Sequence, residues 1–163
     1  MLSSHSWSLQ TADGLSLHIH HWSVATPRWV LLCVQGLGGH GAYYDELAAQ
    51  LADTDPAIVA PDLRGHGLSQ GVRGHAPSFQ PFLSDIHELL TQTRLKYPAI
   101  PLVLLGESMG AALALNYLGK YRPPIDGLIL VSPVLKPVVT PTLSEVATFL
   151  SYALINPRKP VLI

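Results

Sequence analysis

The run Gly106-Glu107-Ser108-Met109-Gly110 places a serine between two glycines, a spacing that can present a hydroxyl for nucleophilic attack. A serine hydroxyl is a weak nucleophile, so it must be held towards both a substrate and a base. The apolar residues 102–105 before the run predict a strand, and residues 109–121 predict a helix. In this strand-to-helix context G-x-S-x-G exposes its serine on a sharp turn, which the two glycines allow to close. We therefore predict that Ser108 is a nucleophile; the alternative is an ordinary serine in a tight turn.

A second glycine-rich segment, Val34 to Gly41, could supply the amide groups that such chemistry needs. Glycines such as Gly36 let the backbone approach a substrate closely. Acyl transfer builds negative charge on the carbonyl oxygen, and two backbone N–H groups can stabilise that charge. We predict that the N–H groups of Leu37 and Met109 form this oxyanion hole, since Met109 starts its helix, where amides lack intrahelical acceptors.

The same segment also fits the G-x-G-x-x-G spacing of a dinucleotide-binding loop through Gly36, Gly38 and Gly41. Such a loop needs an acidic residue for a ribose about 20 residues further on, and Asp62 lies there. This alternative does not account for the turn at Ser108, so we favour the oxyanion hole.

The elements that would position these residues alternate between strand and helix. From residue 29, apolar runs typical of buried strands are separated by segments with helical apolar periodicity, and a hairpin precedes them. This alternation predicts an α/β fold with a mostly parallel sheet and helices on both faces. The expected strands cover residues 6–10, 15–22, 29–34, 58–60, 102–105 and 128–131, and the expected helices cover residues 43–51, 79–93 and 109–121.

Three motifs together resemble the α/β-hydrolase family, within it the branch of monoacylglycerol lipases, lysophospholipases and serine aminopeptidase S33-type hydrolases. The motifs are Gln35 to Gly38 followed by residues 43–48, the turn Pro61 to Ser69, and the serine run 106–110. The part of the chain that carries the resemblance is residues 12 to about 135. The resemblance implies an α/β-hydrolase fold that is truncated before its last strands.

The resemblance also implies a serine hydrolase acting on carboxylic acyl esters, with lysophospholipid- or monoacylglycerol-like lipids as the expected substrates. In that family the first motif usually begins His-Gly; here Gln35 takes the place of the histidine, which keeps the backbone donors and changes their support. The family's turn is structural, so we expect His66 to be a hydrogen-bonded turn residue and not the catalytic base. Residues 136–163 resemble the start of the family's lid, which leaves residues 1–135 as the core.

The triad of this fold runs along the chain as serine, then acid, then histidine. No histidine follows Ser108, because the last of the eight is His87. The two later acids are Asp126, at the wrong end of its expected strand, and Glu145, in the lid-like segment. We therefore expect the triad acid and base downstream of this chain, which would make it the N-terminal, inactive part of a longer hydrolase. The alternative is a truncated, non-catalytic binding module.

Two other groups of residues have less specific patterns. His18 and His20 alternate onto one face of the hairpin, where a metal pair is conceivable. We favour solvated strand residues, and no metal site is expected. The single cysteine, Cys33, lies in an apolar run and is expected to be a small buried side chain.

The composition narrows the function classes further. Ten basic and eleven acidic side chains give a net charge of -1, which offers no basic field to a nucleic acid. No organic cofactor is expected, and the expected partner is a small-molecule acyl ester or lipid, with peripheral membrane contact through the lid as a hypothesis. No apolar run is long enough for a membrane span, and the first 20 residues hold no secretory signal, so we expect a cytoplasmic protein. The oligomeric state is left open.

Overall fold

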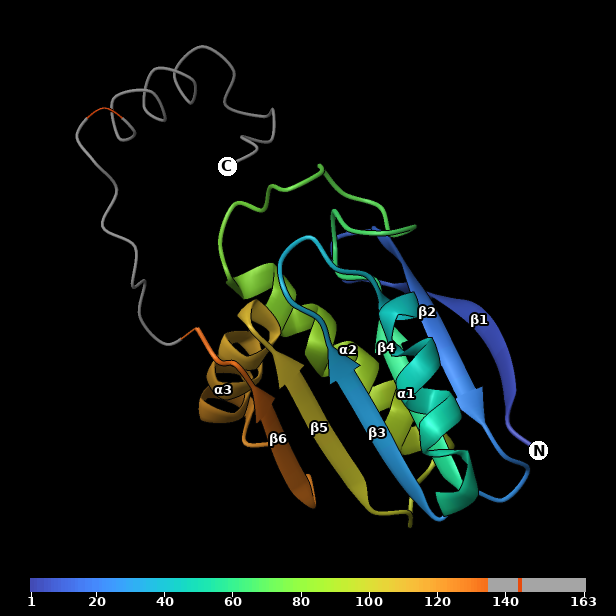
Figure 1. Ribbon diagram of the computed structural model, residues 1–163. Helices are drawn as coiled ribbons and strands as arrows, with labels where there is room; N and C mark the ends of the chain where they lie inside the picture. Colours follow the sequence, from blue (N-terminus) through green and yellow to red (C-terminus); the bar gives the residue numbers. More distant parts are fainter. Residues whose placement is uncertain (135–143, 145–163) are drawn as a thin grey trace.

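A six-stranded mixed sheet carries helices on both of its faces in the computed structural model, which describes residues 1–134 and Ser144 (Figure 1). The strand order is β1-β2-β4-β3-β5-β6. Strands β1 and β2 form an antiparallel hairpin, β2 and β4 pair antiparallel, and the other neighbours pair parallel. The predicted mostly parallel sheet is confirmed. Except for Ser144, the lid-like residues 136–163 lie outside the described residues. The strands are β1 Ser3–Gln10, β2 Ser16–Ser23, β3 Trp29–Val34, β4 Pro56–Pro61, β5 Leu102–Glu107 and β6 Gly127–Val131.

The helices divide between the two faces of the sheet. Helix α1 covers one face, and α2 and α3 cover the other (Figure 1). The expected helix over residues 43–51 is shorter than predicted, because 3-10 turns precede and follow α1. Tyr43, which the helical pattern places on the buried side, is 65% exposed because it belongs to the first of these turns. The helices are η1 Gly41–Tyr44, α1 Asp45–Gln50, η2 Ala52–Thr54, α2 Gln80–Lys96 and α3 Met109–Tyr121.

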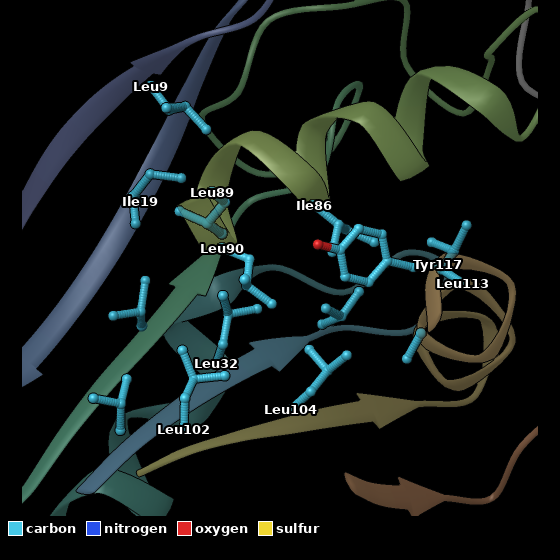
Figure 2. Packing of buried hydrophobic residues seen from close by; sticks show 14 of the residues in the cluster. Leu9, Ile19, Leu32, Ile86, Leu89, Leu90, Leu102, Leu104, Leu113 and Tyr117 are labelled. Atoms are coloured by element: carbon cyan, nitrogen blue, oxygen red, sulfur yellow. The ribbon is translucent and has the colours of Figure 1, made fainter. Parts of the chain in front are cut away.

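The central strand β3 contributes side chains to the hydrophobic clusters on both faces. Its residues alternate, so that Leu32 packs towards α2 and α3 while Cys33 packs towards α1. Figure 2 shows the larger cluster, in which Leu32 and Leu104 from the sheet lie near Leu113 and Tyr117 from α3. Fully burying one such leucine contributes about 1.5–3 kcal/mol. This two-sided burial explains why the strand reads as a continuous apolar run.

Strand β6 differs from the buried strand that its sequence predicts. Leu128, Ile129 and Val131 are 38%, 45% and 43% exposed. Among the described residues β6 pairs with β5 alone, so one edge and much of its faces have no described neighbour. The strand therefore forms where it was expected, but its apolar composition does not correspond to burial within residues 1–134.

The order of the strands places the site. The chain passes from β3 to β4 on one side and then crosses β3 to form β5 on the other side. In open α/β sheets the carboxyl ends of strands at such a reversal form the crevice where ligands bind. The turn after β5 and the loop after β3 therefore lie side by side at this edge.

Candidate active site

Ser108 occupies a strained turn between β5 and α3. Its φ of 52° and ψ of -115° lie in a region that residues with side chains rarely adopt. The Ser108 N–H donates to the carbonyl of Val131 at 2.9 Å, and its own carbonyl accepts the N–H of Ala111 at 3.1 Å. These bonds hold the serine between β6 and the first turn of α3, which is the strand-to-helix turn that the sequence predicts.

The two glycines of the motif allow α3 to approach the sheet closely. A Cβ on Gly106 would lie 2.6 Å from the Cα of Ala111, and a Cβ on Gly110 would clash with the carbonyl oxygen of Val34. Neither neighbour can move without shifting a strand or a helix, because both contacts involve backbone atoms. Gly106 and Gly110 are therefore required by packing.

The loop after β3 lies against Ser108. A Cβ on Gly36 would be 3.2 Å from the Cβ of Ser108 and 3.7 Å from its Oγ, so a side chain here would crowd the serine, and glycine avoids this contact. The loop turns back through a hydrogen bond from the N–H of Gly39 to the carbonyl of Gly36 at 3.2 Å. Among the described residues, the N–H groups of Leu37 and Met109 have no protein acceptor. The structure thus brings together the elements on which the predicted serine and oxyanion donors lie.

Gln35 supports this loop through a hydrogen bond of its side chain. Its side chain is only 1% exposed, and its Nε2 donates to the carbonyl of Gly39 at 2.7 Å. Its Oε1 is buried and has no partner among the described residues. Gln35, which stands where the family usually has a histidine, therefore links the start of the loop to Gly39 through one hydrogen bond.

Asp62 ties three segments together. Its Oδ1 accepts the N–H of Gly41 at 2.6 Å and faces Nε2 of His20 at 3.1 Å, while its Oδ2 accepts the N–H of Leu68 at 2.7 Å. The side chain is 1% exposed, so it cannot reach a ribose. The dinucleotide alternative is therefore wrong. The link from His20 to Asp62 has no local signal in the sequence, because it arises from the pairing of β2 with β4.

A buried arginine anchors the turn that Asp62 begins. Arg64 donates from Nε and Nη2 to the two carboxylate oxygens of Asp85 on α2, both at 2.7 Å, and from Nη1 to Asp13 at 2.8 Å. The hydrogen bond from Arg64 lowers the pKa of Asp13 to about 2, whereas burial raises the pKa of Asp85 against the opposing effect of Arg64. His66 Nδ1 donates to the carbonyl of Arg64 at 3.0 Å, so His66 is the turn residue that was expected.

None of the eight histidines, all of which lie in the described residues, hydrogen-bonds to Ser108. His87 Nδ1, on α2, contacts the hydroxyl of Tyr117 on α3 at 3.2 Å. His21 is buried, and burial, with smaller effects from Lys96 and His5, lowers its pKa to about 4. Among the described residues, no histidine is therefore positioned by a hydrogen bond to act as the base for Ser108.

Three further expectations concern Asp126, Cys33 and the histidine pair. Asp126 lies at the opposite edge, where its Oδ2 accepts the N–H of Leu102 at 2.8 Å, as its place before β6 predicts. Cys33 is fully buried, and burial raises the pKa of its thiol. His18 and His20 do share a face, but His20 is only partly solvated, because its side chain is 18% exposed and its Nε2 bonds to Asp62.

Residues 1–134 and Ser144 contain neither a cluster of three metal-ligating side chains nor a helix that could span a membrane. In this part of the chain no three His, Cys, Asp or Glu side chains are grouped so that they could hold a metal ion. Its helices include none with the length and apolar character needed to cross a membrane.

Comparison with known proteins adds to this geometry. Residues 25–159 match the family described as serine aminopeptidase, S33. The chain is 35% identical to monoglyceride lipase of Rattus norvegicus over 128 residues, which is 78% of this chain and 42% of the relative. It is 30% identical to phospholipase YtpA of Bacillus subtilis over 115 residues, 70% of this chain and 44% of the relative. A solved lipase in its open form superposes with a TM-score of 0.78 at 22% identity, covering 98% of this chain and 54% of that chain. The chain thus spans less than half the length of these two curated relatives.

Proposed function

Because this chain belongs to the serine aminopeptidase S33 family of α/β-hydrolases, we propose that it carries the nucleophile and oxyanion hole of a serine esterase. In the first step the Oγ of Ser108 attacks the ester carbonyl carbon, and its proton passes to a general base. The N–H groups of Leu37 and Met109 donate to the developing oxyanion. Collapse of the tetrahedral intermediate releases the alcohol, which takes up that proton, and water then hydrolyses the acyl-serine to a carboxylic acid.

One observation carries this proposal. A non-glycine residue with a φ of 52° is held beside a glycine that leaves its hydroxyl side open. Strain at a residue persists only when its surroundings impose it, and it concentrates at functional sites. Two amides without described acceptors, at the start of α3 and in the loop after β3, are on the elements that flank this serine. An ordinary turn serine would need neither feature.

We propose monoacylglycerol- or lysophospholipid-like lipids as the substrates. The support is the names of the relatives, a monoglyceride lipase and a phospholipase. Both classes present a single acyl ester next to a polar alcohol, so the same nucleophile and oxyanion hole serve either. Parallel assays of both lipids with the natural full-length protein distinguish them: hydrolysis of short p-nitrophenyl esters without hydrolysis of either lipid would reject the lipid assignment and leave the esterase.

The acid and the base are proposed to come from outside the described residues. The support is the order of the triad in this fold together with the absence of a hydrogen bond from any of the eight histidines to Ser108. The competing function is a binding module that keeps the fold without acyl transfer, and the same absence favours it. Labelling of the serine separates the two.

The test is labelling of the natural full-length protein with a fluorophosphonate probe, followed by trypsin digestion. Residues 97–120, between Lys96 and the cleavage after Lys120, contain Ser108 as their only serine, so an adduct on this peptide identifies it. We expect the adduct in the natural protein and in the control Ser84→Ala, and its loss in Ser108→Ala. A folded protein that stays unlabelled supports the binding module and rejects the esterase.

A further inference from the structure

Strand β2 presents two histidines on the face that α1 covers. His18 and His20 are neighbours there, with ring centres 4.7 Å apart and planes at 76°. Trp22, next on the same face, stacks on His20 with an interplanar angle of 11°. The proposed esterase chemistry uses neither imidazole, so the pair is open to another role.

The contacts of His20 determine which of its nitrogens carries the proton. A carboxylate only accepts hydrogen bonds, so the 3.1 Å contact with Asp62 makes Nε2 the donor, and in the neutral imidazole the lone pair is then on Nδ1. Gly41 packs against Cδ2, because a Cβ added to Gly41 would clash with that atom. Nδ1 lies on the opposite edge of the ring from Cδ2, away from this contact. The partly exposed imidazole therefore has an Nδ1 with no hydrogen-bond partner among the described residues.

This arrangement is the one that metal-binding histidines show. A ligating imidazole almost always donates its other N–H to a carboxylate or carbonyl, which fixes the tautomer and makes the nitrogen more basic. Asp62 is that carboxylate for His20, and it is itself held by the backbone N–H groups of Gly41 and Leu68. The supporting shell for one metal ligand is thus already in place.

The separation of the rings fits a shared cation. A zinc ion bound by two imidazoles at about 2.0–2.1 Å, with a bond angle near the tetrahedral value, holds the ring centres roughly 5 Å apart. The observed 4.7 Å agrees with this spacing, and the His18 ring has no hydrogen bond within the described residues. We propose that His18 and Nδ1 of His20 form a two-histidine site for a first-row divalent cation such as Zn²⁺, with water as the remaining ligands. Imidazole is a preferred ligand of Zn²⁺, Cu²⁺ and Ni²⁺.

The second histidine pair of the hairpin, His5 and His21, is unsuitable as a cation site. His21 Nδ1 lies 2.9 Å from Nε2 of His5, but its Nε2 is already engaged with the hydroxyl of Tyr97 at 2.9 Å. The ammonium group of Lys96 lies 3.3 Å from Nδ1 of His21, where it would repel a cation. The pair on the opposite face of β2 is therefore not a second cation site, and it provides an internal control.

The test is titration of the natural full-length protein with Zn²⁺ by calorimetry, together with long-range proton–nitrogen NMR of the imidazoles. We expect one site, with the zinc-induced shift on Nδ1 of His20 and on one nitrogen of His18. Replacing either ligand, in His18→Gln or His20→Gln, should weaken binding about tenfold or more, the loss typical of damage to a metal site. His5→Gln and His75→Gln are the controls and should bind as the unmodified chain does.

Three outcomes overturn the proposal. The first is no heat and no imidazole shift at millimolar Zn²⁺. The second is binding that survives His18→Gln but is lost in His5→Gln, which would place the cation at the pair of His5 and His21. The third is a shift on Nε2 of His20, which would mean that the bond to Asp62 breaks on binding. Labelling of Ser108 is not involved, so failure here leaves the esterase proposal standing.

Discussion

Replacing Ser108 by glycine is expected to stabilise the fold while it removes the nucleophile. The φ of 52° and ψ of -115° are strained for serine and accessible to glycine. Alanine at the same position removes the same hydroxyl but keeps a Cβ, and therefore keeps the strain. The pair of variants separates the chemistry of the side chain from the conformation of the backbone.

The magnitude follows from two opposing terms. A residue held in a sparsely populated region costs about 1–3 kcal/mol, which glycine recovers. Glycine loses more conformational freedom on folding, at about 0.5–1 kcal/mol relative to alanine. The described residues offer the Ser108 hydroxyl no hydrogen-bond partner, so its removal breaks no such bond within them. We expect Ser108→Gly to be roughly 0.5–2 kcal/mol more stable than Ser108→Ala.

The assay is urea unfolding followed by the fluorescence of the three tryptophans, with midpoints compared at a common slope. Both variants should lose fluorophosphonate labelling, and only Ser108→Gly should unfold at a higher urea concentration than the unmodified chain. If the two variants unfold at the same concentration, or if alanine is the more stable, the strain at Ser108 is not real and the argument from it fails.

The remaining predictions use the same unfolding measurement. Gly110→Ala should destabilise the fold by about 2 kcal/mol or more, because the added Cβ clashes with the backbone of Val34. Gly119→Ala, which has open space around it, should stabilise the fold by about 0.5–1 kcal/mol. Equal effects of the two substitutions would contradict the close packing of α3. Arg122→Gly should stabilise by about 0.5–1 kcal/mol, because Arg122 ends α3 with a φ of 45°, and a loss of stability would show that its side chain contributes more than its strain costs. The pKa of His21 falls from 6.5 to about 4 on folding, so the unfolded chain binds the proton more readily. The free energy of unfolding should therefore be at its full value above pH 6.5 and decline towards pH 4, by at most about 3 kcal/mol. An unfolding midpoint that does not depend on pH over this range would refute the buried neutral imidazole.

Local signals predicted the elements around Ser108 well, because the turn and the core strands depend on short-range patterns. The run around the serine needs small residues at fixed offsets, and β3 needs continuous apolar side chains, so both appear directly in the sequence. The links from Arg64 to Asp85 and to Asp13 span 21 and 51 residues, and no periodicity points to them. The link from His20 to Asp62 depends on the antiparallel pairing of β2 with β4, which the apolar runs do not specify.

The same links show how the site is made rigid. Two side chains hold the ends of the loop after β3. The Gln35 amide donates to the Gly39 carbonyl, and the Asp62 carboxylate accepts the N–H of Gly41. A carboxylate that accepts charge-assisted bonds from two loops and from His20 orders both loops against the hairpin. Oxyanion stabilisation depends on donors that need no rearrangement during the reaction. The polar turn that begins at Asp62 therefore contributes to the site by holding the loop after β3 in place, although Asp62 is distant from Ser108 in the sequence.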